Sequence, residues 1–260
     1  MKVLSLFDGI SCGMVALERA GIQVDRYVAY EIEPNAIKIS QKNYPQIEHC
    51  GDVTTADFTQ YQGFDLVIAG SPCQGFSIAG GKLNFEDPRS KLYFEFERAL
   101  EEVKPKYFLL ENVKMKKEWA DFISARLGVQ GVNINSKLLS GQSRSRTYWT
   151  NIDFQTKIPD KGITLQSILE FGETERKKSK TIRIGGAGSG WGNKHEWDMP
   201  NEFRVYTTKE LERLQTLPDN YTSCNGVLES QRRKCIGNGW TVDVIVHILQ
   251  GLKEMEVLPE

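Results

Sequence analysis

The sequence predicts an α/β fold, a doubly wound and mostly parallel sheet. Along the first half of the chain, short apolar runs typical of strands alternate with segments of helical spacing. Such alternation is typical of parallel sheets that carry helices on both faces. A polar or reactive residue also follows each strand pattern. That position is notable because open α/β sheets bind ligands at the carboxyl ends of their strands.

The elements follow in order along the chain. The predicted strands are KVLSLF at 2–7, RYVAYEI at 26–32, IEHCGDV at 47–53, FDLVIAG at 64–70, KYFLLENV at 106–113 and QSRSRTYW at 142–149. The predicted helices are CGMVALERAG at 12–21, PNAIKISQKNY at 34–44, RSKLYFEFERALEEV at 89–103, TTKELERLQTL at 207–217 and TVDVIVHILQGLKEM at 241–255. Gly21 suits a C-cap, Pro34 suits a first helical turn, and Thr207 or Thr208 suits an N-cap.

The regular pattern breaks near residue 154 and returns near residue 204. The residues between are rich in Gly, Lys and Ser and contain GGAGSG, which predicts a small inserted region or a long binding loop. We therefore predict a main domain over 1–154, an inserted region over 155–203 and a C-terminal segment over 204–260 that completes the main domain.

Composition excludes several classes of protein. The five cysteines contain no CxxC pair and the three histidines are isolated, so neither a disulfide framework nor a zinc site is expected. A reducing, cytoplasmic location fits best. The start KVLSLFDG lacks signal-peptide features, and no apolar run has a membrane-spanning length. The net charge of −1 is not that of a strongly basic nucleic-acid binder, although basic residues cluster at 176–183 and 232–234.

Polar side chains at the strand ends are expected to meet at one edge of the sheet, which we call the carboxyl edge. They are Asp8, Glu31, Asp52, Cys73 and Glu111. The turn FDGISCG, with Glu31 after the next strand, suits a nucleotide or nucleoside whose ribose Glu31 would hold. The spacing is not GxGxxG, so a purely structural turn is the alternative. Asp52 suits either an adenine amino group or a local cap.

The stretch GSPCQGFS places Cys73 on a loop between proline and glycine, where a thiolate could act as a nucleophile. The alternative is a small apolar filler. Glu111 could donate a hydrogen bond to a ring nitrogen, or it could be an ordinary exposed strand-end glutamate. Arg144 and Arg146 are two residues apart, so on a strand both would face one side and suit an anion or a carbonyl-rich base. Surface arginines on an edge strand are the alternative.

Together these stretches resemble the DNA cytosine-5 methyltransferases, and they occur in that family's order. The matching segments are FDGISCG, YEIEPNA, GDV, GSPCQGFS, ENV, QSRSR, RVYTTKELERLQTLP and GNGWTVDVI. VLSLFDGI, SKLYFEF and GWTVDVI are closest to the catalytic domain of the de novo class. Ser11 and Cys12 replace a glycine pair found in many bacterial members, which changes details of the turn.

The resemblance implies the methyltransferase fold, S-adenosylmethionine as cofactor and duplex DNA as substrate. It implies a cofactor site made of Phe7, Asp8, Gly9, Ile10, Ser11, Glu31, Ile32, Asp52, Val53, Pro72, Leu92, Asn238, Trp240 and Thr241. Cys73 would add to carbon 6 of a flipped cytosine, Glu111 would stabilise or protonate nitrogen 3, and Arg146 would hold the base carbonyl. Arg144 would support Cys73 or a nearby phosphate.

The inserted region lies where this family keeps its target-recognition region. The residues expected to contact DNA are Ser77, Lys82, Arg183, Ser189, Trp191, Asn193, Lys194, Arg232 and Arg233. No metal is expected. A homodimer and a monomer both stay open, as do association with the nucleoid and a place in restriction–modification.

Three other interpretations compete with this one. Some family members act on transfer RNA with the same catalytic set. A nicotinamide-dependent dehydrogenase would share the fold type, but it predicts the absent GxGxxG turn and leaves PCQ and ENV unexplained. A catalytically silent DNA-binding member would be expected to lack the cysteine or the glutamate, and this chain has both.

Overall fold

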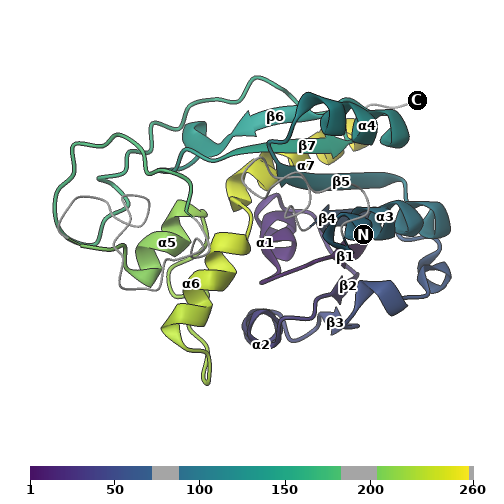
Figure 1. The fold of residues 1–260 in the computed structure, drawn as a ribbon, viewed down its shortest axis with the longest axis horizontal. Coiled ribbons are helices and arrows are strands. Elements are labelled where there is room, and N and C mark those ends of the chain that lie inside the picture. Colours follow the sequence, from purple (N-terminus) through teal and green to yellow (C-terminus); the bar gives the residue numbers. More distant parts are fainter. Residues whose placement is uncertain (72–87, 183–203, 258–260) are drawn as a thin grey trace.

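The computed structural model describes residues 1–71, 88–182 and 204–257 (Figure 1). Its centre is a seven-stranded sheet in the order β3-β2-β1-β4-β5-β7-β6. The strands are β1 (Lys2–Leu6), β2 (Arg26–Tyr30), β3 (Glu48–His49), β4 (Leu66–Gly70), β5 (Tyr107–Val113), β6 (Val132–Asn135) and β7 (Ser145–Thr150). The first five strands pair in parallel, whereas β7 runs antiparallel to β5 and β6. The predicted mostly parallel α/β sheet is therefore confirmed.

Helices link the parallel strands as the sequence predicts. The α-helices are α1 (Cys12–Arg19), α2 (Pro34–Asn43), α3 (Pro88–Val103), α4 (Lys117–Leu127), α5 (Thr208–Leu214), α6 (Glu229–Asn238) and α7 (Val242–Val257), and the short 3₁₀ turns are η1 (Val53–Thr55), η2 (Phe58–Tyr61) and η3 (Ser136–Leu138). Thr207, not Thr208, is the N-cap of α5, because its side chain and that of Glu210 form a reciprocal capping box. The sequence analysis did not predict α4, β6 or α6.

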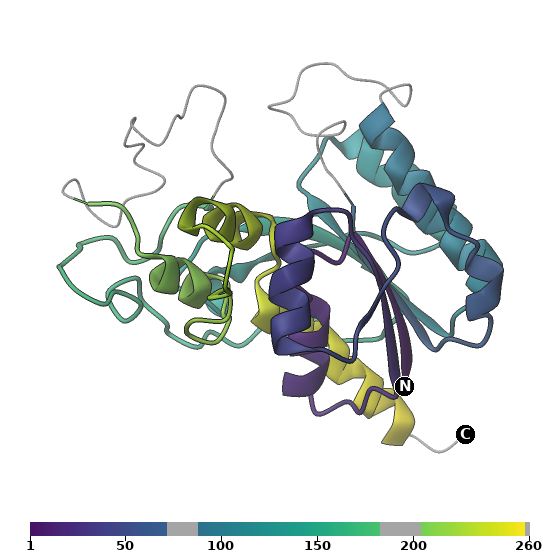
Figure 2. The same cartoon turned by 90° about the horizontal axis from the view of Figure 1, so that it is seen from below.

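Two apolar cores lie on opposite faces of the sheet. One contains buried residues of α1, α2 and α7, and the other lies under α3, α4, η1 and η2. Figure 2 shows the strands edge-on between these two layers of helices. Such double coverage explains why β1, β4 and most of β5 are almost continuously apolar.

A third, smaller core joins the inserted region to the helices that follow it. Leu165, Ile168 and Ile182 pack with Tyr206, Leu211, Leu214 and Ile236. Residues 163–182 therefore share a core with α5 and the end of α6, while α7 packs on the main sheet. The predicted domain boundaries stay a prediction. Within the described ranges, no helix is both long enough and apolar enough to cross a bilayer.

Candidate active site

The turn between β1 and α1 has an unusual backbone. Phe7, Gly9 and Ser11 have φ angles of 56°, 61° and 58°, in the left-handed region that L-residues rarely adopt. Ile10 is 1% exposed, and its carbonyl accepts a 2.6 Å hydrogen bond from the Tyr221 hydroxyl. These contacts hold an irregular segment at the carboxyl edge, where the sequence predicts the cofactor.

Asp8 turns inward beneath this turn. Its carboxylate accepts hydrogen bonds from Ser5 Oγ (2.6 Å), Tyr27 OH (2.7 Å) and Ser11 Oγ (2.5 Å). Burial raises the pKa of this carboxyl above its ordinary value, and the hydrogen bonds oppose that rise. Asp8 therefore organises the turn from within.

Glu31, at the end of β2, fastens the turn to the neighbouring strand. Its Oε2 accepts from the Gly9 amide at 2.7 Å, and its Oε1 accepts from the amides of Ile32 and Glu33 at 2.8 Å. The residue is half-buried, and both of its carboxylate oxygens accept from backbone amides. The adjoining Ile32 is 70% exposed, an unusual placement for a large apolar side chain that suits contact with a ligand.

Three predicted cofactor residues lie next to one another in space near η1 and α3. The exposed Asp52 caps η1, with Oδ1 accepting from Thr54 N and Thr54 Oγ1, both at 2.9 Å. Val53 is buried in the core under α3, and Leu92 of α3 packs against the same core. The hydrogen bonds of Asp52 are therefore those of a local cap, which was one of its two predicted roles. Because the residue is exposed, its carboxylate is also accessible.

Trp240 covers the end of β4 from the C-terminal part of the chain. A Cβ added at Gly70 would lie 2.6 Å from Trp240 Nε1, so the indole lies directly against this glycine. Thr241 is buried, and its hydroxyl donates to Gln215 Oε1 at 2.9 Å. Asn238 is exposed at the end of α6. Trp240 also lies 3.6 Å from a Cβ built at Gly13, so the segment after α6 meets the start of α1 at the carboxyl edge.

Glu111 and Arg146 form an ion pair at this edge. Arg146 Nε lies 2.9 Å from Glu111 Oε1, and the two side chains are only 15% and 10% exposed. Glu111 is paired in register with Gly70, three residues before Cys73. Its neighbour Asn112 is 1% exposed and donates to Ser71 Oγ at 2.8 Å, which ties β5 to the start of that segment. A carboxyl, a guanidinium and the approach to Cys73 therefore come together.

The hydrogen-bond partners that the described residues give Arg144 differ from the ion-pair partner of Arg146. β7 begins at Ser145, so Arg144 precedes the strand and the alternation that predicted a common side does not apply to it. Arg144 is buried and donates to the carbonyls of Ile182, Gly237 and Gly239, each at 3.2 Å. Arg144 thus links the inserted region to the junction of α6 and α7.

The two arginines expected on DNA lie on α6. Arg232 donates from Nε to Thr222 Oγ1 at 3.0 Å and lies 3.4 Å from the fully buried Glu212. Arg233 pairs with Glu229 at 2.8 Å along the helix. Both therefore have internal partners. Nine predicted site residues lie outside the described residues: Pro72, Cys73, Ser77, Lys82, Arg183, Ser189, Trp191, Asn193 and Lys194.

Sequence reasoning missed two buried glutamines behind the site. Gln142 donates to the Leu214 carbonyl at 3.1 Å and accepts from the Ile182 amide at 2.9 Å. Gln215 donates to the carbonyls of Ile236 and Gly239 at 2.9 Å. They position the segment that leads into Trp240. The sequence gives no clear signal for either glutamine, because Gln142 lies between Gly141 and Ser143, and Gln215 lies between Leu214 and Thr216.

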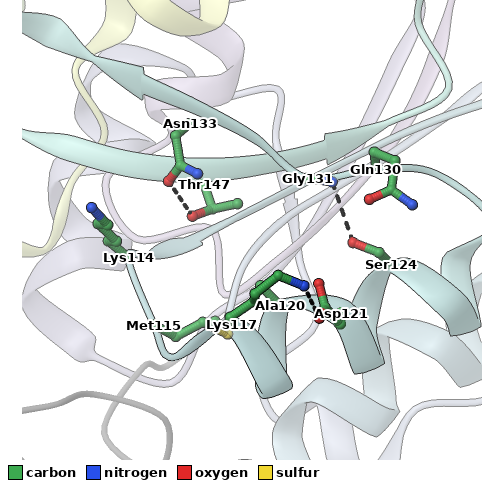
Figure 3. Close-up of a pocket in the computed structure, with 10 residues that line it drawn as sticks. All are labelled: Lys114, Met115, Lys117, Ala120, Asp121, Ser124, Gln130, Gly131, Asn133 and Thr147. Atoms are coloured by element: carbon green, nitrogen blue, oxygen red, sulfur yellow. Dashed lines mark hydrogen bonds and ion pairs between the residues drawn. The ribbon is translucent and has the colours of Figure 1, made fainter.

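A separate cavity of about 320 Å³ lies on the opposite side of β7 (Figure 3). Thr147 lines it and donates to Asn133 at 2.9 Å, whereas the preceding Arg146 belongs to the Glu111 pair. Strand alternation accounts for these opposite directions. None of the predicted site residues within the described ranges lines this cavity. Among the described residues, no three His, Cys, Asp or Glu side chains gather as metal ligands.

Comparison with known proteins gives the family. A model for C-5 cytosine-specific DNA methylases matches residues 1–121 and 115–254. The type II methyltransferase M.NlaX of Neisseria lactamica is 29% identical, over 97% of this chain and 96% of that protein. M.NgoBV of Neisseria gonorrhoeae is 31% identical, over 82% of this chain and 60% of that protein.

Solved structures agree on the fold. Entamoeba histolytica methyltransferase EhMeth has a TM-score of 0.82 at 17% identity and covers 99% of both chains. Dnmt2 methyltransferase of S. pombe has a TM-score of 0.77 at 21% identity, covering 99% of this chain and 100% of that one. Because the family model matches nearly the whole chain, this chain belongs to the C-5 cytosine-specific DNA methylase family and is a DNA (cytosine-5-)-methyltransferase.

Proposed function

We propose that this chain transfers a methyl group from S-adenosylmethionine to carbon 5 of a cytosine flipped out of duplex DNA, through a covalent adduct with Cys73. The observation that carries the proposal is the largely buried Glu111–Arg146 pair beside Gly70, at the start of the segment that contains Cys73. Family membership gives the reaction class, and the pair suggests how a cytosine ring would be held.

The residues at the carboxyl edge fit the proposed cofactor. The carboxylate of the half-buried Glu31 would accept from ribose hydroxyls, and Ile32 offers exposed apolar surface to a purine. Gly9 and the left-handed turn allow close approach of the backbone, and Trp240 encloses the site over Gly70. S-adenosylmethionine, when bound, supplies an electrophilic methyl group. Asp8 acts only through the turn, because its carboxylate bonds inside the protein.

Cys73 and Glu111 carry the proposed steps at the cytosine ring. The target base leaves the duplex at an energetic expense of a few kcal/mol. The Cys73 thiolate forms a bond to ring carbon 6, and the ring electrons move toward nitrogen 3, where Glu111 donates a hydrogen bond or proton. Carbon 5 thereby becomes nucleophilic and gains the methyl group. Methyl transfer leaves S-adenosylhomocysteine, and a base then removes the carbon 5 proton, so that the electrons of that bond expel the Cys73 thiolate. Any proton held on nitrogen 3 returns to Glu111, which regenerates the enzyme.

Arg146 has two tasks in this proposal. Its Nε holds Glu111 in place, and its guanidinium presents further donors to the base carbonyl oxygen. Removing a donor aimed at developing charge typically reduces turnover by about 10²–10³-fold. The observed pair therefore couples orientation of the acid with recognition of the base.

A covalent trap tests the proposal. Duplex DNA of varied sequence that contains 5-fluorocytosine, incubated with S-adenosylmethionine, should give a complex that survives denaturing electrophoresis. Cys73→Ala should abolish it, whereas Cys224→Ala should retain it, because Cys224 is a half-exposed thiol outside the predicted site. Trapping of fluorinated transfer RNA but not DNA would overturn the substrate, and trapping by Cys73→Ala would overturn the nucleophile.

A further inference from the structure

A row of hydrogen bonds joins the turn at residues 7–11 to the outer strand β3. Ser11 Oγ lies 2.5 Å from Asp8 Oδ2 and 2.6 Å from Ser40 Oγ, and Ser40 Oγ lies 3.0 Å from His49 Nε2. We propose that His49 is a positioning residue for S-adenosylmethionine, acting as a neutral imidazole whose Nε2–H anchors this row. The inference rests on the proposed function, because it takes the turn to be the cofactor site.

The number of available protons determines which atom donates and which accepts in each hydrogen bond of the row. With Asp8 ionised, its oxygens accept from Ser5, Tyr27 and Ser11. Ser11 has one hydroxyl proton, so it must accept from Ser40, and Ser40 in turn must accept from His49. The proton of the neutral imidazole therefore lies on Nε2. Each serine is fully buried, so no water can replace these partners without cost.

The other ring nitrogen explains why the imidazole stays neutral. His49 Nδ1 is buried and has no hydrogen-bond partner within the described part of the chain. At this buried position, a nitrogen lone pair without a hydrogen-bond partner is less unfavourable than an N–H group without one. Proteins rarely bury an N–H group that lacks an acceptor. The charges facing the ring are Asp8 and Glu31, while α2 contributes the neutral Ser40. Burial lowers the pKa of His49 below 6.5, although both carboxylates oppose this.

The row matters because the turn is strained. Phe7 and Ser11 are non-glycine residues with φ of 56° and 58°, a conformation that costs about 1–2 kcal/mol each. Such backbone persists only where surrounding contacts determine it. Ser11 is one of the strained residues and also the second member of the row. Loss of the His49 donor would therefore loosen the turn and weaken cofactor binding, with less effect on the chemical step.

The test measures binding of S-adenosylhomocysteine by calorimetry at pH 8.0 and pH 5.5. His49→Leu removes the donor and should weaken binding about 10-fold at pH 8.0, as loss of one buried hydrogen bond predicts. Protonation of the buried Nδ1, which has no partner among the described residues, should weaken wild-type binding at pH 5.5 relative to pH 8.0. His49→Gln keeps an N–H near Nε2, so it should bind like the wild type at pH 8.0 and show no such weakening at pH 5.5. His247→Gln is the matched control, since His247 lies on α7 and its Nε2 donates to the Gln155 carbonyl at 2.7 Å, outside the row.

Nitrogen NMR of the histidine rings gives a second readout that requires no cofactor. The His49 signals, assigned by their loss in His49→Gln, should show a proton on Nε2 and none on Nδ1 at pH 7.5. A proton on Nδ1 would overturn the inference, as would unchanged affinity in His49→Leu. If the wild type failed to bind S-adenosylhomocysteine at either pH, the proposed cofactor would be wrong, and the NMR result would still decide the tautomer.

Discussion

Two polar clusters at the carboxyl edge of the sheet differ in how their charges are satisfied. At the turn after β1, Asp8 has three hydroxyl partners within the protein, and Glu31 accepts from three backbone amides. At the ends of β5 and β7, Glu111 makes a single ion pair, with Arg146, among the described residues. The first cluster is built to hold a backbone shape. The second retains unused donor and acceptor capacity in a nearly buried place.

That difference indicates which side chains face the reacting groups of the substrate. A buried carboxyl without a full set of partners is costly, so it persists where a ligand completes it. We therefore expect substitutions in the second cluster to reduce catalysis with little loss of stability. Substitutions in the first cluster should reduce cofactor affinity and stability together.

The largest effect is expected from Glu111→Gln. The amide keeps the size of the side chain but cannot supply the proton or the charge that pairs with Arg146. Methyl transfer should fall by about 10²–10⁴-fold. Single-turnover kinetics would measure it, alongside S-adenosylhomocysteine affinity, which should stay within about 3-fold. An equal loss of affinity would place Glu111 in the cofactor cluster instead.

The two arginines give the next comparison. Arg146→Lys replaces the planar group beside Glu111 with a point charge, so kcat should fall by about 10²-fold without a change in melting temperature. Arg144→Met removes a donor from three carbonyls, of which Gly239 still accepts from Gln215, and should destabilise the fold by about 1–3 kcal/mol. Denaturant titration and kinetics on both variants decide the matter. The reverse pattern would show that Arg144 is the residue facing the substrate.

Gly70→Ala probes the contact that closes the edge. The added Cβ would lie 2.6 Å from Trp240 Nε1, so the indole must shift, at about 1–3 kcal/mol. Thermal melting of Gly70→Ala, Trp240→Leu and the double variant tests this. In the double variant the alanine should be nearly neutral. If it remained as damaging there, the clash would not be with Trp240.

The smallest effect concerns pH. Burial lowers the pKa of His49 in the folded chain below its ordinary 6.5, so the unfolded chain binds more protons in that range. The contribution of His49 to stability is therefore complete above pH 6.5 and declines as the pH falls toward the folded-state pKa. His49→Gln should flatten the drop in melting temperature between pH 7 and pH 5. A steeper drop would contradict the neutral imidazole.

Much of the fold follows from local patterns. Every strand before residue 114 and the helices α1, α2, α3, α5 and α7 occur where periodicity and caps predict them. The missing elements are α4, β6 and α6. α6 has mostly polar residues and lacks a side-chain N-cap, so little in its sequence distinguishes it from a loop.

The candidate site, like the fold, could be predicted only in part from the sequence. The sequence indicates that Asp8, Glu31, Asp52 and Glu111 follow strands, because that depends on local order. It cannot say which way each carboxyl turns, because the deciding partners are distant: Tyr27 for Asp8 and Arg146 for Glu111. Arg144 is the clearest case. β7 begins at Ser145, three residues later than predicted, so Arg144 precedes the strand and its side chain reaches Gly237 and Gly239.

The most direct measurement of the central claim is the identity of the methylated product. The full chain would be incubated with isotope-labelled S-adenosylmethionine and duplex DNA of varied sequence, and the DNA digested to nucleosides for mass spectrometry. We predict labelled 5-methyl-2′-deoxycytidine with the wild type and a loss of it with Cys73→Ala and Glu111→Gln. Label on the exocyclic nitrogen of cytosine, on adenine, or only on transfer RNA offered in parallel would contradict the account.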